Sequence, residues 1–85
     1  VNTMLQSRNG DILEVDIHGM TSKEAKRDLE QLLSRADKNI KEVRVVHGYH
    51  NGQVLRDMVR RQLKHPRIAS KLLCLNPGET RLILK

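Results

Sequence analysis

Apolar and polar residues alternate along positions 12–17, which places three apolar side chains on one face and acidic side chains on the other. This period of two is typical of a strand with one buried face. A second run of β-branched residues at 43–46 predicts a short, largely buried strand. Residues 1–10 have no periodicity, and we expect a mobile N-terminal arm or, alternatively, an edge strand. The folded domain should then span residues 11–85.

Two stretches have apolar residues at helical spacing. Thr21 and Glu24 have the spacing of a capping box, so a helix should begin there. Its apolar stripe consists of Ala25, Leu29, Leu32, Leu33 and Ala36. A second helix is predicted over 54–64 and should stop before Pro66. Its inward side chains should be Val54, Leu55, Met58, Val59 and Leu63.

Two further strands are expected at 72–75 and 80–84, and the segment 76–79 joins them. Pro77 and Gly78 suit the central positions of a type II turn, which predicts an antiparallel hairpin. The first two strands and the helix between them form a βαβ unit, which brings these strands parallel. The sequence therefore predicts an α+β two-layer sandwich of βαβαββ order. It has a four-stranded mixed sheet with both helices on one face.

The composition of the chain limits the kind of core and the cellular compartment that we expect. The chain has no Phe and no Trp, so its core must be aliphatic. The single cysteine, Cys74, lies in an apolar run and is expected to be a buried, reduced thiol. No apolar run approaches the roughly 20 residues of a membrane span, and the start of the chain lacks the apolar region of a signal peptide. We therefore expect a cytoplasmic protein without a membrane partner.

The net charge of +6 is concentrated in one segment. Residues 54–71 contain six basic side chains against the single acid Asp57. This asymmetry indicates a polyanionic partner, with nucleic acid first and an anionic membrane surface second. A solubilising helix face is the alternative. The candidate phosphate contacts are Arg56, Arg60, Arg61 and Lys64, and three of them (Arg56, Arg60 and Lys64) should form an outward row on the second helix.

Candidate chemistry lies where the two parallel strands end. Asp16 and His18 follow the first strand and His47 follows the second, so all three should border one crevice. His47 titrates near neutrality and suits a general acid or base, but it could equally cap its loop by bonding to the backbone. Asp16 could orient a histidine, hold a cation or act as a base, or it could bond the N–H groups of its own turn.

The loop 47–52 adds further candidates. Gly48 and Gly52 allow the backbone to approach a phosphate, and a helix follows directly. Tyr49 could stack on a base or pack over the loop. Asp16, His18, His47 and His50 have the side-chain types that bind zinc or another divalent ion, although the spacing is a permissive pattern. Whether an ion such as Mg²⁺ takes part is left open.

Several motifs occur in a distinctive order along the chain. They are Val15-Asp16-Ile17-His18-Gly19, Glu24-Ala25, Val45-Val46-His47-Gly48 with Gly52, Leu55 and Arg56, and Asn76-Pro77-Gly78-Glu79-Thr80. This succession resembles the small MutS-related (Smr) domain over essentially the whole chain after the arm. The resemblance implies the βαβαββ fold, DNA or RNA binding and, in many members, endonuclease activity. The family usually has His-Gly-x-Gly-x-Gly in the second motif, and His50 stands here where the middle glycine is expected.

Two classes of function follow. In the first, the protein is a DNA or RNA nicking endonuclease in which Asp16, His18 and His47 serve the chemistry. The basic residues and the loop residues Gly48, Tyr49, His50 and Gly52 would then hold the nucleic acid. In the second class, the chain is a non-catalytic module that binds nucleic acid or a protein partner. The sequence does not distinguish DNA from RNA as the ligand.

Overall fold

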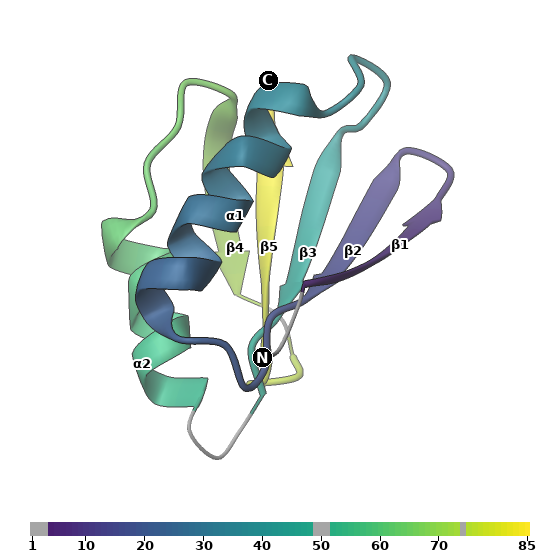
Figure 1. The fold of residues 1–85 in the computed structure, drawn as a ribbon. Coiled ribbons are helices and arrows are strands. Elements are labelled where there is room, and N and C mark those ends of the chain that lie inside the picture. The colour runs from purple at the N-terminus through teal and green to yellow at the C-terminus, as the bar shows by residue number, and fades with distance from the viewer. Residues whose placement is uncertain (1–3, 49–51, 74) are drawn as a thin grey trace.

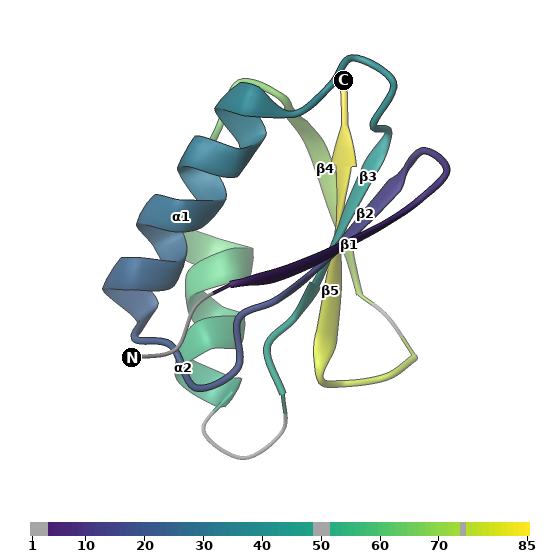
Figure 2. The same cartoon turned by 45° about the vertical axis from the view of Figure 1, so that its right-hand side comes forward.

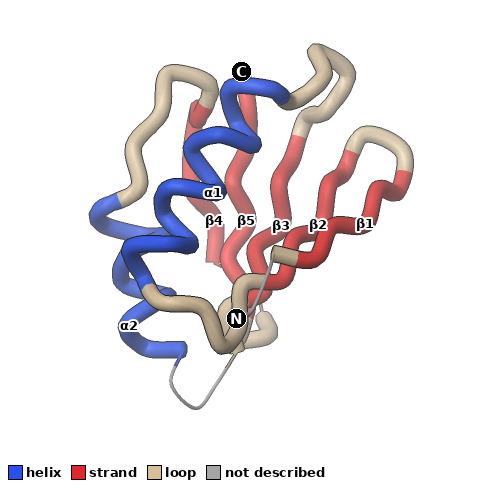
Figure 3. Tube along the Cα trace, viewed as in Figure 1, coloured by secondary structure: helices blue, strands red, loops and turns tan. Residues whose placement is uncertain are grey.

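A computed structural model describes residues 4–48, 52–73 and 75–85. One five-stranded sheet has the order β1-β2-β3-β5-β4, and both helical segments cover the same face of it (Figures 1 and 2). The tube in Figure 3 shows the same two layers. The elements are β1 (Leu5–Asn9), β2 (Ile12–Asp16), α1 (Ser22–Arg35), β3 (Glu42–Val46), α2 (Gly52–Asp57), the π-helix η1 (Met58–Gln62), β4 (Ile68–Leu73) and β5 (Glu79–Leu84).

The first helix and the parallel strand pair agree with the sequence. Thr21 caps α1, with its hydroxyl accepting the amide of Glu24 at 3.2 Å. Of the predicted stripe, Ala25, Leu29, Leu32 and Leu33 are buried. Strands β2 and β3 are parallel, with Val15 opposite Val45. The predicted two-layer α+β fold, with both helices on one face, is therefore confirmed.

The sheet has five strands instead of the predicted four. Within the segment 1–10, Leu5–Asn9 forms the edge strand β1, antiparallel to β2. All five residues of β1 are exposed, which explains why no hydrophobic alternation marks them in the sequence. Pairing with β2 through a tight turn, and not burial, makes this segment a strand. Of the two expectations for residues 1–10, a mobile arm or an edge strand, the edge strand is therefore the one found over Leu5–Asn9.

The second helix differs from the predicted 54–64. It is α-helical only over Gly52–Asp57 and then widens into η1, where the amide of Leu63 reaches the carbonyl of Met58 at 2.8 Å. Leu55, Met58, Val59 and Leu63 are buried as expected, but Val54 is exposed. Lys64 lies beyond the helix, because the chain turns extended at Leu63. The prediction that Arg56, Arg60 and Lys64 form one row on a single helix is therefore wrong.

The strand predicted at 72–75 corresponds to β4, which begins earlier. It spans Ile68–Leu73, and the apolar run at its end is exposed: Leu72, Leu73 and Leu75 all face solvent. The reason is that β4 is an edge strand and that Lys71, not a leucine, occupies the position opposite the buried Leu82. The predicted burial of Cys74 lies outside the described residues.

The turn between β4 and β5 is also of a different type. The antiparallel hairpin is confirmed. Gly78, however, does not have the positive φ that a type II turn requires at its third residue. The turn is closed by the amide of Glu79 on the carbonyl of Asn76 at 3.2 Å and by the amide of Gly78 on the Asn76 side-chain oxygen at 2.9 Å. The turn therefore keeps Pro77 and Gly78 at its central positions, but it is not of type II and the Asn76 side chain stabilises it.

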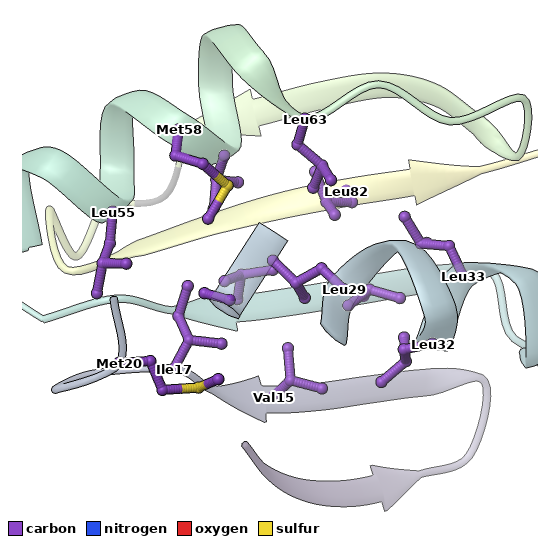
Figure 4. Packing of buried hydrophobic residues seen from close by; sticks show 14 of the residues in the cluster. Val15, Ile17, Met20, Leu29, Leu32, Leu33, Leu55, Met58, Leu63 and Leu82 are labelled. Atoms are coloured by element: carbon purple, nitrogen blue, oxygen red, sulfur yellow. The ribbon is translucent and has the colours of Figure 1, made fainter. Parts of the chain in front are cut away.

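The core lies between the sheet and the two helical segments, and among the described residues it consists of aliphatic side chains and methionines (Figure 4). Leu29 and Leu33 of α1 belong to one buried cluster with Val15 of β2, Leu63 and Leu82 (Figure 4). Among the described helices, none is long and apolar enough to cross a membrane. This small core fixes the ends of β2, β3 and β5, where the candidate site lies.

Candidate functional site

Three loops meet at one end of the sheet, at the bottom of Figure 1. They follow β2, follow β3 and precede β5. The carbonyl of Gly78 accepts the amides of His47 at 2.8 Å and Gly48 at 3.0 Å, which ties the third loop to the second. Gly48 has φ of +85°, and a Cβ there would lie 3.6 Å from the Cβ of His18. The two histidine-glycine motifs therefore touch each other.

Asp16 and His18 form an oriented pair at the end of β2. The Nδ1–H of His18 donates to Asp16 Oδ1 at 2.5 Å, and the backbone amide of His18 donates to the same oxygen at 3.0 Å. The His18 side chain is 67% exposed, against 32% for Asp16. Asp16 therefore has two of the four roles expected of it, since it bonds an N–H of its own turn and orients a histidine. The result is a fixed imidazole that faces solvent.

His47 has a very different environment, because it is only 1% exposed. Its Nε2 lies 3.0 Å from Thr80 Oγ1, and its Nδ1 lies 3.4 Å from the carbonyl oxygen of Gly48. Both ring nitrogens thus have partners inside the protein. This geometry favours the loop-capping alternative over a general acid or base that meets a ligand directly.

The charge state of His47 follows from these surroundings. Burial lowers the pKa of His47 below its ordinary value, and the bond to the Gly48 carbonyl raises it in part. The positive charges of Arg60 and Arg56 lower the pKa further. His47 is therefore a neutral imidazole near pH 7.

The predicted basic residues fall into two groups. Arg56 and Arg60 are half-buried and lie close enough to His47 to affect its pKa. The Nε of Arg60 donates to Thr80 Oγ1 at 3.1 Å, and the Nε of Arg56 lies 3.6 Å from the carboxylate of Asp57. Arg61 and Lys64 are exposed. Two arginines thus lie beside the His47-Gly48 loop, at the end of the sheet where the sequence predicts a crevice.

Other predicted residues lie partly beyond the description. Tyr49 and His50 lie outside the described residues, and Gly52 is the first residue of α2. Among residues 4–48, 52–73 and 75–85, no group of three or more potential ligands could hold a metal ion. The four-residue metal hypothesis stays a prediction, because it includes His50.

Sequence reasoning missed Thr80 and Asn76 as parts of this site. Thr80 is fully buried and joins His47 to Arg60, while Asn76 shapes the turn that presents the Gly78 carbonyl. One signal points to Thr80 in the sequence. It shares the alternation of Leu82 and Leu84, so it lies on the buried face, where a hydroxyl needs a partner.

The Smr domain family model matches residues 15–79, which includes both histidine-glycine motifs and the turn before β5. The chain belongs to the Smr domain family. Among solved structures, the chain is similar to the Smr domain of Thermus thermophilus MutS2, with 29% identity and a TM-score of 0.74. That match covers 85% of this chain and 96% of the other. Among curated proteins, none matches the chain significantly.

Membership accounts for the shared fold of this Smr domain and for its motif order. Smr domains generally bind nucleic acids, and nicking endonucleases occur among them. The β2–α1–β3 unit brings the two histidine motifs together, and the Asn76 turn supports the second. Only His18 of the two motif histidines is exposed to a ligand in this Smr domain.

Proposed function

We propose that this Smr domain binds DNA or RNA at the crevice and nicks the phosphodiester backbone there. The observation that carries the proposal is the exposed His18 ring held by Asp16 at the end of β2. A carboxylate on Nδ1 fixes the tautomer and directs Nε2 outward as a base. It also stabilises the imidazolium that forms when the base takes a proton.

The reaction class is phosphodiester hydrolysis. Water attacks phosphorus while Nε2 of His18 takes its proton, the bond from phosphorus to the leaving oxygen breaks, and the leaving oxygen takes up a proton from solvent water. Asp16 stays ionised and balances the charge on the ring. General acid or base catalysis of this kind contributes typically about 10² to 10⁴-fold. His47 takes no proton in this scheme, because its nitrogens are engaged inside the fold.

Binding rests on positive charge beside the crevice. Arg56 and Arg60 lie next to the His47-Gly48 loop, and Arg61 and Lys64 are exposed basic residues further along the chain. Phosphate contacts of this kind position a nucleic acid without reading its sequence. The net charge of +6 favours association with a polyanion.

A second candidate function is nucleic-acid binding without cleavage. The burial of His47 favours it, because only one of the two motif histidines is then left for chemistry. Both candidates share the binding surface. They differ in whether His18 takes part in breaking a phosphodiester bond, so a cleavage assay distinguishes them.

The test is incubation with labelled single- and double-stranded DNA and RNA, with Mg²⁺ and with a chelator. His18→Ala should lose about 10² to 10⁴-fold in rate with nearly unchanged affinity. Asp16→Asn should lose part of this cleavage rate, because the variant keeps the His18 ring but orients it less firmly. The matched control is His65→Ala, since His65 bonds Ser34 near the other end of α1. Wild-type protein that binds every probe and cuts none would leave only the binding module.

The binding surface has its own test in the salt dependence of affinity. Log affinity falls with log salt with a slope near −0.9 per duplex phosphate neutralised. Changing Arg56, Arg60 and Lys64 together to Gln should make the slope shallower by about 3. Arg35, Lys38 and Lys41, which are exposed at the other end of the sheet, form the matched triple. Equal effects of the two triples would mean that the crevice is not the binding surface.

A further inference from the structure

Thr80 joins two residues of the crevice from inside the fold. It is fully buried on β5, and its hydroxyl oxygen lies 3.0 Å from His47 Nε2 and 3.1 Å from Arg60 Nε. Thr80 lies opposite Val45 in the sheet, so its position is fixed by the ladder between β3 and β5. A rigid strand therefore carries the hydroxyl.

The direction of these hydrogen bonds follows from donor chemistry. Arginine has only N–H donors, so Arg60 Nε donates and Thr80 Oγ1 accepts. The neutral His47 places its Nδ1–H toward the Gly48 carbonyl, which leaves Nε2 as an acceptor. The single hydrogen of the Thr80 hydroxyl therefore goes to His47. A chain of donors runs from Arg60 through Thr80 to His47 and Gly48.

The backbone of Arg60 is also held. Lys71 on β4 donates its Nζ to the carbonyl of Arg60 at 3.3 Å and to the carbonyl of Leu63 at 2.5 Å. These carbonyls belong to the π-helical segment and its end, where the α-helical pattern of bonds is lost. Arg60 is thus held at its carbonyl by Lys71 of β4 and at its Nε by Thr80 of β5.

We infer that Thr80 is a positioning residue that aims Arg60 at a phosphate of the bound nucleic acid. With Nε used by Thr80, the outer N–H groups of the guanidinium are the ones that meet the two phosphate oxygens. The same hydroxyl holds His47, so one atom sets the arginine and the loop that border the phosphate. The inference rests on the proposed nucleic-acid binding at the crevice.

The experiment measures binding of a short fluorescein-labelled DNA duplex and of its single strand. Thr80→Val keeps the shape but loses the hydroxyl, and it should weaken binding about tenfold, which corresponds to about 1.4 kcal/mol. Thr80→Ser restores the hydroxyl and should recover most of the affinity. The Arg60→Gln variant should lose at least as much as Thr80→Val, and the double variant should be no weaker than Arg60→Gln alone.

Arg60→Lys tests the same idea in a fold that keeps Thr80 and its bond to His47. A lysine has the charge but cannot bond Thr80 and a phosphate with a planar fork. Its affinity should fall close to that of Arg60→Gln. Full affinity of Arg60→Lys, or additive losses for Thr80→Val and Arg60→Gln, would overturn the role of Thr80. The Arg60→Lys outcome holds even where Thr80→Val folds poorly.

Failure of the proposed function looks different from failure of this inference. Unchanged binding by Arg60→Gln would show that the phosphate lies elsewhere, and both ideas would then fall. Weak binding by Arg60→Gln with normal binding by Thr80→Val would remove only the positioning role. The salt slope separates charge from geometry, because loss of one phosphate contact makes it shallower by about 0.9.

Discussion

Replacing His47 by alanine separates a structural histidine from a catalytic one. The imidazole is 1% exposed, and it bonds Thr80 and the Gly48 carbonyl. His18, the other motif histidine, has a side chain that is 67% exposed. The two substitutions to alanine should therefore have opposite signatures. His47→Ala should act mainly on the free energy of unfolding, and His18→Ala should act mainly on cleavage.

The expected loss of stability follows from burial and hydrogen bonding. Removing a fully buried ring of this size leaves a cavity, and large-to-small core changes cost about 2 kcal/mol or more. Loss of the 3.0 Å bond to Thr80 adds about 1 kcal/mol. The total is about 3 kcal/mol. For a domain of this length each kcal/mol lowers Tm by roughly 4–8 °C, so His47→Ala should melt about 12–24 °C lower.

The effect of His47 on stability should also depend on pH. Burial lowers the pKa of His47 in the folded state below the value near 6.5 of the unfolded chain. As pH falls below about 6.5, the unfolded state takes up a proton that the folded state resists, so the free energy of unfolding decreases. His47→Ala lacks this contribution. The stability difference between wild type and variant should be largest above about pH 7 and should shrink on acidification.

The assay is urea unfolding of wild type, His47→Ala and His18→Ala at several pH values, beside a cleavage or binding assay below the lowest Tm. His18→Ala should unfold within about 1 kcal/mol of wild type, because the His18 side chain is mostly exposed and its removal deletes one side-chain hydrogen bond. A His47→Ala protein that melts with wild type yet loses all cleavage would refute the reasoning. His47 would then contact the reacting phosphate in a rearranged loop.

Three further substitutions test other parts of the fold. Glu42→Gln should cost about 2 kcal/mol, less than breaking a fully buried pair, because its partners Arg44 and Arg81 are about one third exposed. The bond to Arg81 lowers the pKa of Glu42, so in urea titrations this loss should be fully present above the ordinary value of 4.5 and should disappear as the pH falls through the lower pKa of the folded state. Gly78→Ala should disturb the Asn76 turn, because a Cβ there would lie 3.3 Å from the Asn76 Oδ1 that accepts the Gly78 amide. Faster amide hydrogen exchange at Gly48, which bonds the Gly78 carbonyl, would report it. Lys71→Met should loosen η1 and weaken DNA binding several-fold, and unchanged affinity would mean that η1 holds without that cation.

Much of the fold could be predicted because local patterns and burial agree there. Helix α1 has a capping threonine and an apolar stripe of one period, and its boundaries follow from both. Strands β2 and β3 have a buried face, which fixes their register and their parallel pairing through the βαβ rule. In these elements each residue's local preference and its tertiary environment point the same way.

The rest depends on contacts that no local pattern records. Strand β1 has five exposed residues and exists only because β2 offers it an edge. Two carbonyls of η1 and its end accept the ammonium group of Lys71, which comes from β4. The apolar run after Lys71 suggested a buried strand, yet it lies at an edge where the chain leaves the sheet. Sequence periodicity describes the faces of an element and not the neighbours that complete it.

The different environments of the two motif histidines follow from the register of β2 and β3. Asp16 pairs with Val46, and the amide of Ile17 still reaches the Val46 carbonyl at 2.9 Å, so the ladder continues one residue past each strand. Side chains alternate between faces, and His47 therefore takes the inward position beside the buried Ile17. His18 comes one residue later and falls on the outer side. A single-residue offset in where each histidine follows its strand thus makes one imidazole part of the core and leaves the other for a ligand.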